Sequence, residues 1–334
     1  VLIMLAWWFM KAYHARNPRT SSLWQCAHRH YAEFEQLYPE KYQPRYGFLR
    51  PVIPEVVHKF IQCGDLQRGF ARIRCDHCQH EYLLAFSCKS RSFCPSCHQR
   101  HVQTSARFIL DQVVAPVPHR HYVLAIPRML RPYFQRHRFL LKDLCRVAQE
   151  SLSEYLRTAL GLPKGIPGII LTLHTFGEYL DFHPHIHALV ADGLFTHPLP
   201  PPTPRNPDSL PAPNDATPCF TDLPETALKP LEELFRAKVI ALLIRHKLLP
   251  PERVQVLYSW KHSGFNVHAG ESVPPEAKAD LEDLAQYILR NPFSVEKMTL
   301  ESPTDMVIYR SRLNAKINRN FEIFTSTDFL AAIT

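Results

Sequence analysis

The chain has 334 residues, 46% of them hydrophobic, and its 39 lysines and arginines outnumber its 31 acidic residues, for a formal charge of +8. This apolar content excludes an intrinsically disordered chain, and the length is sufficient for two packed domains. The apolar stretch Val1–Met10 is far shorter than the roughly 18 residues of a membrane span and lacks the basic leader of a signal peptide. We therefore expect it to form the apolar face of a first helix, in a cytoplasmic protein.

The predicted elements begin with helices, because apolar residues recur at helical intervals over 23–37 and 52–61. Residues 1–62 are thus predicted to form a helical segment, followed by a cysteine-rich module over 63–101. The later predicted helices are 102–114, 129–160, 225–249 and 275–290, and the predicted strands are 121–127, 168–174, 183–190 and 254–260. The proline-rich stretch 198–218 is predicted to be an exposed loop without catalytic content.

Six of the nine cysteines lie between Cys63 and Cys97. Four of them form two Cys-x-x-Cys pairs, Cys75 with Cys78 and Cys94 with Cys97, a spacing that predicts a closed tetrahedral Zn²⁺ site of structural function. Disulfides are the alternative, which the absence of a secretory signal disfavours. Spacing alone leaves open whether Cys63, Cys88, His98 and His101 add ligands or build a second site. The isolated cysteines are expected to be buried as small hydrophobic residues: Cys26, Cys145 and Cys219.

The positive charge is concentrated in one region. Between Arg68 and Arg138 there are 12 basic and 3 acidic residues, which gives 12 − 3 = +9 and leaves about −1 for the rest of the chain. A concentrated positive field favours a polyanionic partner such as nucleic acid, although a solvated basic face is the simpler alternative. The candidate DNA-binding residues are Arg68, Arg72, Arg74, Lys89, Arg91 and Arg100.

Four histidines lie within fourteen residues. His185 and His187 are two apart on a predicted strand, so both imidazoles project from the same face. If the predicted strand 168–174 lies antiparallel beside the strand of His185 and His187, His174 reaches the same metal ion. His183 is the alternative third ligand, because residues i, i+2 and i+4 of one strand share a face. Three imidazoles leave open positions on a metal ion, which predicts a site for chemistry.

These motifs together resemble the rolling-circle insertion-sequence transposases of the IS ninety-one family, which are HUH enzymes, named for two histidines flanking a hydrophobic residue. The resemblance rests on FSCKSRSFCPSC, HYVLAIP, HTFGEYLDFHPHIHALV, WKHSGFNVH and LAQYILRNPFS, in this order along the chain. It implies an α+β fold, in which an HUH endonuclease domain over 102–334 follows the helical segment and a small zinc-ribbon-like module. The histidines would lie on a central strand of an antiparallel sheet with flanking helices, and His174 stands where relatives have their third ligand.

The resemblance also implies a nucleophilic tyrosine. Tyr287 falls at the edge of the apolar stripe of its predicted helix, from which a phenol can reach a cleft. The residues four before and four after it are Asp283 and Asn291, which implies a single-tyrosine enzyme. The implied reaction is attack on single-stranded DNA that leaves a 5′-phosphotyrosine, with Mg²⁺ or Mn²⁺ as cofactor and with the ends of a mobile element and its target as partners. The alternative is that Tyr287 has no catalytic role and is an ordinary residue at the boundary between the apolar and polar faces of its helix.

Three other functions remain open on the sequence: a replication initiator or relaxase with the same chemistry, a metal-dependent hydrolase using Glu178 or Asp181, and a non-catalytic zinc-ribbon DNA-binding remnant. The chain ends at FTSTDFLAAIT, inside a predicted helix, and relatives continue further. The C-terminus is therefore expected to be truncated.

Overall fold

The chain is a mixture of helices and sheets arranged in two compact units. The computed structural model describes residues 17–90, 92–196, 219–260, 263–291, 293–314 and 318–334. Unit 1 contains the described residues up to His101 together with Phe293–Thr334, and unit 2 contains Val102–Pro292. Helix α4 (Pro95–Gln112) runs across the boundary between them. In the described part of the chain, no helix has both the length and the apolar character needed to cross a membrane.

The N-terminal part of unit 1 is helical. Helix α1 begins where the Ser21 side chain accepts a hydrogen bond from the backbone N–H of Trp24, which satisfies one of the unpaired donors at a helix start. The buried residues of α1 recur at helical spacing, among them Leu23, Cys26 and Phe34. The elements are η1 (Pro18–Thr20), α1 (Ser22–Leu37), the π-helix η2 (Tyr38–Tyr42), α2 (Gln43–Tyr46), α3 (Val52–Ile61) and η3 (Leu66–Arg68).

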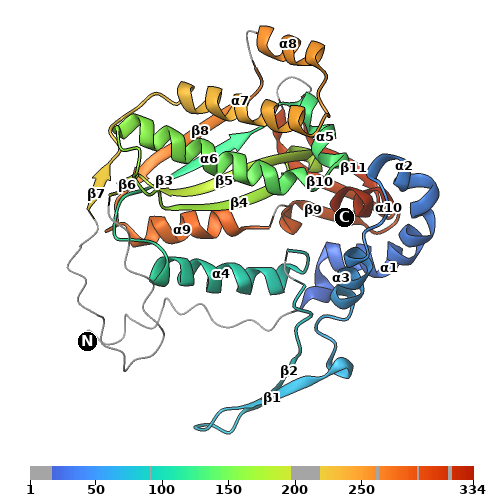
Figure 1. Ribbon diagram of the computed structural model, residues 1–334. Coiled ribbons are helices and arrows are strands. Elements are labelled where there is room, and N and C mark those ends of the chain that lie inside the picture. Colours follow the sequence, from blue (N-terminus) through green and yellow to red (C-terminus); the bar gives the residue numbers. More distant parts are fainter. Residues whose placement is uncertain (1–16, 91, 197–218, 261–262, 292, 315–317) are drawn as a thin grey trace. The chain divides into compact units, whose positions relative to one another are not determined.

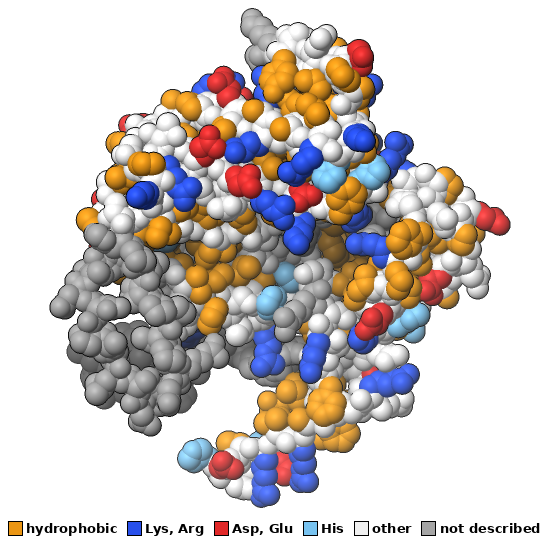
Figure 2. Space-filling model, in the orientation of Figure 1, with side chains coloured by type: hydrophobic (Ala, Val, Ile, Leu, Met, Phe, Trp, Pro, Cys, Tyr) orange, Lys and Arg blue, Asp and Glu red, His pale blue; other side chains and the backbone are white. Residues whose placement is uncertain are grey.

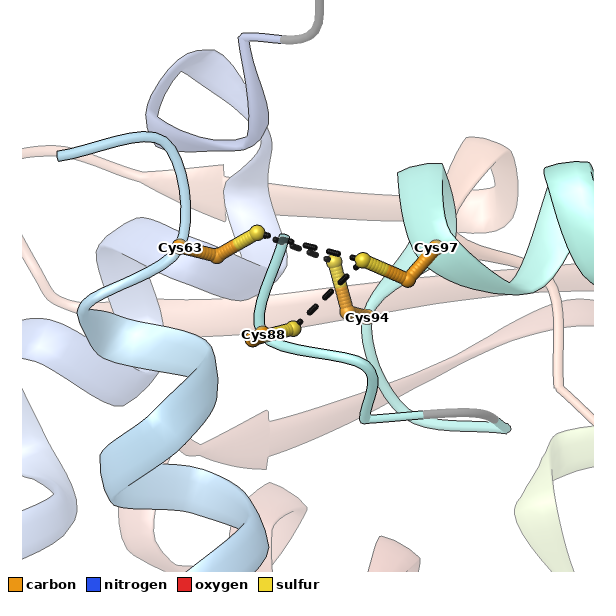
Figure 3. Close-up of side chains that lie close together, drawn as sticks. All are labelled: Cys63, Cys88, Cys94 and Cys97. Atoms are coloured by element: carbon orange, nitrogen blue, oxygen red, sulfur yellow. Dashed lines mark hydrogen bonds between the residues drawn. The ribbon is translucent and has the colours of Figure 1, made fainter. Parts of the chain in front are cut away.

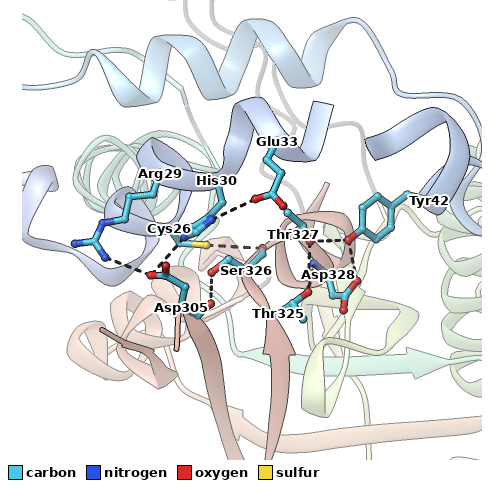
Figure 4. Close-up of polar contacts among 10 residues, drawn as sticks. All are labelled: Cys26, Arg29, His30, Glu33, Tyr42, Asp305, Thr325, Ser326, Thr327 and Asp328. Atoms are coloured by element: carbon cyan, nitrogen blue, oxygen red, sulfur yellow. Dashed lines mark hydrogen bonds and ion pairs between the residues drawn. The ribbon is translucent and has the colours of Figure 1, made fainter. Parts of the chain in front are cut away.

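The C-terminal segment packs onto these helices and so belongs to unit 1. It forms the turn η6 (Val295–Lys297), an antiparallel sheet of β9 (Met298–Glu301), β10 (Met306–Asn314) and β11 (Arg319–Thr325) in the order β11-β10-β9, and helix α10 (Ser326–Ile333). Figure 4 shows how polar groups join the two ends of the chain. The Cys26 thiol donates to the Ser326 carbonyl oxygen at 3.9 Å, and the Tyr42 hydroxyl donates to Asp328 Oδ1 at 2.8 Å.

This grouping differs from the predicted division, which assigned 293–334 to the second domain. The difference arises from contacts between segments about 300 residues apart in sequence, and local patterns carry no information on such contacts. The salt bridge of Arg29 with Asp305, at 3.4 Å, and the hydrogen bond from Arg50 to the Thr334 carbonyl oxygen, at 2.6 Å, are further examples.

A separate antiparallel hairpin of unit 1 consists of β1 (Phe70–Arg74) and β2 (Glu81–Ala85), which pair in register from Phe70–Ala85 to Arg74–Glu81. Its side chains are mostly exposed on both faces. Figure 2 shows basic and hydrophobic side chains side by side on this hairpin. The sequence analysis did not predict it as a pair of strands.

Unit 2 is built on a four-stranded antiparallel sheet in the order β4-β5-β3-β8. Strands β5 and β3 are the inner pair, and their ladder runs from His119–Ala191 to Ala125–His185. The strands are β3 (His119–Ala125), β4 (Ile169–Phe176), β5 (Phe182–Ala191) and β8 (Asn266–Val273); the short pair β6 (Gly193–Phe195) and β7 (Phe220–Asp222) lies beside them.

Helices cover both faces of this sheet (Figure 1). Helices α6 and α7 pack on the face that carries Tyr122, Leu124 and Ile186, each at most 1% exposed, and this side forms the main hydrophobic core. Helix α9 packs on the opposite face, against β5. The helical elements of unit 2 are η4 (Arg128–Leu130), α5 (Arg131–Arg136), α6 (Leu140–Leu160), η5 (Glu178–Leu180), α7 (Lys229–Arg245), α8 (Pro251–Ser259) and α9 (Lys278–Leu289).

Two local predictions in unit 2 are wrong. The predicted strand over 254–260 is helix α8, because Pro251 occupies the first helical turn, where its missing N–H costs nothing, and Leu257 is buried three residues after Val254. The predicted single helix over 129–160 is divided into η4, α5 and α6, since His137 leaves the helical conformation. The stretches 1–10 and 198–218 lie outside the described residues, as do Arg91 and the His262 of the segment WKHSGFNVH.

One ion pair at the end of the inner strands should contribute strongly to the stability of unit 2. Arg120 donates to both carboxylate oxygens of Asp192, at 2.8–3.1 Å, and Asp192 is 4% exposed. Arg120→Ala is expected to lower the free energy of unfolding by about 3–5 kcal/mol, because it leaves a buried carboxylate without its partner. Urea unfolding measures the change. Arg146→Ala, which removes an exposed side chain bonded to Asp143, should cost less than about 1 kcal/mol. Equal costs for the two variants would contradict this account.

Candidate functional site

Four cysteines of unit 1 converge on one point (Figure 3). Cys63 follows α3, Cys88 follows β2, and Cys94 and Cys97 lie at the start of α4. The Sγ atoms of all four lie within 4.8 Å of one another, and three of the four side chains are buried. The cluster therefore joins the ends of three elements that are separate in sequence.

The spacing of these sulfur atoms fits zinc. The distances are 3.6 Å from Cys88 to Cys97, 3.8 Å from Cys94 to Cys63 and 4.0 Å from Cys63 to Cys97. Thiolates about 2.3 Å from a tetrahedral zinc ion lie about 3.8 Å from one another, whereas a disulfide requires about 2.05 Å.

This quartet corrects the predicted one, which combined Cys94 and Cys97 with Cys75 and Cys78. Cys75 and Cys78 are exposed and lie in the turn that joins β1 to β2, outside the cluster. Five residue pairs lie between that turn and the base of the hairpin, so the turn is about 17 Å from the base. A metal–sulfur bond of about 2.3 Å is far too short to join the two ends. Spacing did not distinguish the two sets, since all six cysteines lie within one short segment.

The histidine cluster of unit 2 is formed by strand register. His174 on β4 pairs with His185 on β5, and both lie on the sheet face opposite the main core, on the same face as His187. One ring nitrogen from each of these three residues lies within 4.8 Å of the others. His183 does not belong to this group. The antiparallel pairing of β4 with β5, which the prediction required, is therefore present.

Hydrogen bonds orient the three imidazoles toward a common centre. Nε2 of His174 donates to the Ile288 carbonyl oxygen of α9 at 3.0 Å, and Nδ1 of His185 donates to the His183 carbonyl oxygen at 2.7 Å. Because a carbonyl only accepts, the other nitrogen of each ring carries a lone pair. Nε2 of His187 is buried and has no hydrogen-bond partner among the described residues. A buried nitrogen of this kind is expected of a metal ligand.

Burial keeps these histidines neutral. It lowers the pKa of His174 to about 4 and that of His187 to about 2, and it lowers the pKa of His185 as well. Neutral imidazole is the form that coordinates metal. Three neutral, oriented nitrogen donors therefore fit a divalent cation, with the remaining coordination positions open to a substrate.

The sequence analysis missed His121, on β3. Its Nε2 lies 2.9 Å from Nδ1 of His187, and the two rings are nearly parallel, with centroids 5.1 Å apart. This contact directs Nε2 of His187 toward the other two ligands, as carboxylates and carbonyls do at many metal sites. The signal in the sequence was a second alternating pair, His119 and His121, at the start of a predicted strand.

Tyr287 lies on α9 beside this cluster. Its ring centroid is 5.6 Å from those of His121 and His187, and its side chain is 41% exposed. The Arg290 guanidinium carbon lies 3.9 Å from the centre of the Tyr287 ring, a cation–π contact that the sequence analysis also missed. An exposed phenol, a fixed positive charge and a metal-binding cluster thus lie together.

Substitution of His121 tests whether it positions a ligand. His121→Ala is expected to weaken the binding of Mn²⁺ about 10- to 100-fold, because His187 loses the contact that orients it. Calorimetric titration with Mn²⁺ measures the effect. His183→Ala is the control, since the substitution retains the backbone carbonyl that accepts the hydrogen bond of His185 and removes only the ring contact between the two side chains. A larger loss in His183→Ala than in His121→Ala would contradict the proposed ligand set.

The other predicted residues are distributed as follows. The described candidate DNA-binding residues are exposed and lie in unit 1: Arg68, Arg72, Arg74, Lys89 and Arg100. Cys26 is buried, as expected, and Cys145 is half-buried. Cys219 is exposed, contrary to expectation; it is the residue at which the described chain resumes, just before β7. His268, the last residue of the segment WKHSGFNVH that contributes to the family resemblance, lies on β8, pairs with Val123 and is exposed on the same sheet face as His187.

Comparisons with known proteins relate the chain to transposases. A family model described as "Transposase zinc-binding domain" matches residues 24–126, and one described as "Putative transposase" matches residues 168–334, half of the chain. Over 149 residues the chain is 34% identical to the transposase for insertion sequence element IS801 of Pseudomonas savastanoi pv. phaseolicola, a match that covers 44% of this chain and 35% of that protein.

A second relative, named Putative transposase y4qJ, of Sinorhizobium fredii (strain NBRC 101917 / NGR234), is 26% identical over 170 residues, which are 49% of this chain and 41% of that protein. The chain thus matches less than half the length of each of these relatives. No solved structure matches it. The two family models and the identity to the first relative show that the chain belongs to the IS ninety-one family of insertion-sequence transposases and carries the zinc-binding domain of that family.

Proposed function

We propose that this chain is a DNA transposase of the single-tyrosine HUH type, which cleaves single-stranded DNA by metal-dependent transesterification during rolling-circle transposition. Its family membership supports transposition in general. The HUH assignment is supported by the pair His185 and His187, which flanks the buried Ile186 on an inner strand of an antiparallel sheet.

The observation that carries the proposal is the position of Tyr287. Helix α9 is attached to the histidine cluster through the hydrogen bond from His174 to the Ile288 carbonyl oxygen, one residue after the tyrosine. This bond holds the phenol beside His187 while leaving it open to a substrate. A nucleophile next to a metal-binding cluster is the arrangement that phosphoryl transfer requires.

The proposed step exchanges one phosphate ester for another. The Tyr287 oxygen attacks the phosphorus of a phosphodiester, its proton passes to solvent, and the 3′ oxygen of the preceding nucleotide leaves. The products are a 5′-phosphotyrosine and a free 3′-hydroxyl, so no ATP is required. A Mg²⁺ or Mn²⁺ ion at the cluster would polarise the phosphate oxygens.

The residues around Tyr287 support that step in different ways. His174, His185 and His187 supply neutral nitrogen donors, although an all-imidazole set intrinsically favours softer ions than Mg²⁺. The Arg290 guanidinium places a positive charge beside the phenol, where the charge of the attacked phosphate increases. His121 orients His187 and does not itself contact the phosphate in this proposal.

Unit 1 is proposed to hold DNA. Exposed arginines of the hairpin, Arg72 and Arg74, share Glu81 as an ion-pair partner, at 2.6 and 3.5 Å. Strand β1 itself carries two positive charges and no acid, and solvent-exposed ion pairs of this kind exchange readily for phosphate contacts. The exposed Phe70 and Tyr82 on the same hairpin offer rings on which unpaired bases can stack.

A labelled oligonucleotide tests the proposal. Purified protein is incubated with single-stranded DNA from the ends of the element and Mg²⁺ or Mn²⁺, and covalent complexes are separated under denaturing conditions. A label on the 3′ side of the cut should remain attached to the protein, and a label on the 5′ side should be released with a free 3′-hydroxyl. Replication initiators share this chemistry, so preference for the element's ends over unrelated DNA favours a transposase.

Two other outcomes would overturn the proposal. Cleavage without a covalent complex would indicate a metal-dependent hydrolase, for which a nearby acid or base is needed. Glu178 and Asp181 are exposed and do not belong to the metal-binding group among the described residues, which disfavours this function. DNA binding without cleavage would indicate a non-catalytic remnant.

A further inference from the structure

Unit 2 carries a basic surface of its own. The stretch from Arg128 to Lys142 contains five basic residues and no acidic one, and it forms η4, α5 and the start of α6. Figure 2 shows basic side chains and histidines gathered on the surface over α5 and the neighbouring helices. We name this stretch the basic α5 segment; its basic residues are Arg128, Arg131, Arg136, Arg138 and Lys142.

Neighbouring acids do not neutralise these charges. Arg128, Arg136 and Lys142 are exposed, and no carboxylate of the described residues forms a salt bridge with them. The next acid in sequence, Asp143, pairs instead with Arg146 at 3.2 Å. The arginines of the hairpin in unit 1, in contrast, share an acidic partner. Exposed cations without a partner attract a polyanion without first having to give up an ion pair.

An exposed aromatic ring lies among these cations. Phe139 is 55% exposed, and its ring centroid is 5.9 Å from that of His137 and 5.2 Å from that of His246. Leaving so much apolar surface in water has a cost that a stacked base would remove. Because the bases of a duplex are already paired and stacked, an exposed ring beside cations favours single-stranded over double-stranded nucleic acid.

The basic α5 segment is continuous with the strands of the histidine cluster. Ala125, the last residue of β3, pairs with His185, and the chain passes from there through two residues into η4 and α5. Helix α5 packs against β5, and the Arg138 guanidinium carbon lies 5.6 Å from the centre of the Phe182 ring. Phe182 is three residues before His185 on β5, about 10 Å along the strand. A DNA strand bound at the histidine cluster is therefore within reach of the segment.

We propose that the basic α5 segment is a binding surface for single-stranded DNA, in which Arg128, Arg136 and Lys142 bind phosphates and Phe139 stacks on an unpaired base. The surface holds the strand close to the histidine cluster. Unit 2 thus binds DNA by itself, whereas the DNA-binding residues predicted from the sequence all precede His101. The inference rests on the proposed function, which identifies the bound strand as the DNA that is cleaved.

The salt dependence of DNA binding tests the phosphate contacts. A fluorescein-labelled oligodeoxythymidylate is titrated with the full chain at several salt concentrations, without divalent cations so that it is not cleaved. Arg136→Gln/Lys142→Gln should weaken binding and reduce the slope of log affinity against log salt concentration by about 1.4, since each phosphate contact on a single strand contributes about 0.7. Lys164→Gln/Lys229→Gln removes the same charge from exposed lysines outside the segment and should leave the slope unchanged.

Phe139→Ala tests the stacking contact. It should weaken binding of the single strand about 5- to 150-fold and leave the salt slope unchanged, because it removes a stacking partner and no charge. Binding of a duplex of the same length should not change. Phe48→Ala is the control, since Phe48 is 70% exposed and lies outside both the hairpin and the basic α5 segment. Circular dichroism checks that each variant keeps its fold.

An unchanged salt slope in Arg136→Gln/Lys142→Gln would overturn the inference, as would a failure of the unaltered chain to bind the oligonucleotide. An equal effect of Phe139→Ala on single strand and duplex would exclude base stacking. These measurements are separate from the covalent complex. If that complex does not form while the slope falls as expected, the proposed function is wrong and the binding surface is supported; if it forms while the slope is unchanged, only the surface is wrong.

Discussion

Tyr287→Phe is expected to abolish the covalent protein–DNA complex, with a fall in the cleavage rate on the order of 10⁴-fold or more. The substitution removes only the phenol oxygen, the proposed nucleophile. The contacts of the ring with Arg290 and His187 involve its face and edge, so the substitution retains them. The variant should therefore fold, bind single-stranded DNA and bind Mn²⁺ as the unaltered chain does. Denaturing electrophoresis of the labelled complex measures the loss.

Tyr258→Phe is a matched control for this substitution. Tyr258 is 51% exposed and has the Arg236 guanidinium 4.7 Å from its ring centre, so its surroundings resemble those of Tyr287, but it lies on α8 and not beside the histidine cluster. Full activity is expected of this control. If the covalent complex persists in Tyr287→Phe, another residue is the nucleophile and the proposed mechanism is wrong.

Cys97→Ser is expected to unfold the cysteine-rich part of unit 1. Cys97 Sγ lies 3.6 Å from Cys88 and 4.0 Å from Cys63, so it is central to the cluster that joins α3, β2 and α4. Structural zinc contributes about 10–16 kcal/mol of apparent binding free energy in isolated zinc-finger peptides, and loss of one thiolate forfeits much of such a contribution. Metal analysis should show loss of the tightly bound zinc, and limited proteolysis should cut the segment around α4 rapidly.

Cys26→Ser is the control for that variant. Cys26 is also fully buried in unit 1, but its thiol donates to the Ser326 carbonyl oxygen and is remote from the metal-binding group. A serine side chain is close to the thiol in size but buries a more polar hydroxyl, so we expect a cost of about 1–3 kcal/mol and an unchanged zinc content. If Cys97→Ser kept its zinc and its resistance to protease, the cluster would not be the structural site.

Several parts of the fold could be predicted because their signals are local. The helix over 52–61 was predicted with the bounds that α3 has, since its apolar residues repeat at helical spacing within ten residues. The strands that became β4 and β5 were found from branched residues and the alternation of His185, Ile186 and His187. Strand periodicity alone places the two histidines on one face, whatever the rest of the chain does.

Contacts between distant segments could not be predicted in the same way. The role of His121 depends on the register of β3 with β5, and that of the Ile288 carbonyl depends on the packing of α9, which no local pattern encodes. The assignment of 293–334 to unit 1 depends on α10 packing against α1. Burial of apolar faces selects such pairings among many that the sequence permits.

The cysteines separate the two kinds of information most clearly. The sequence by itself determined that this protein has a metal-binding module and a histidine pair on one strand face, because residue type and spacing carry those signals. Only the tertiary structure decided which cysteines join Cys94 and Cys97. The length of the hairpin β1–β2 places Cys75 and Cys78 at one end and Cys63 and Cys88 at the other, and a metal–sulfur bond is far shorter than that separation.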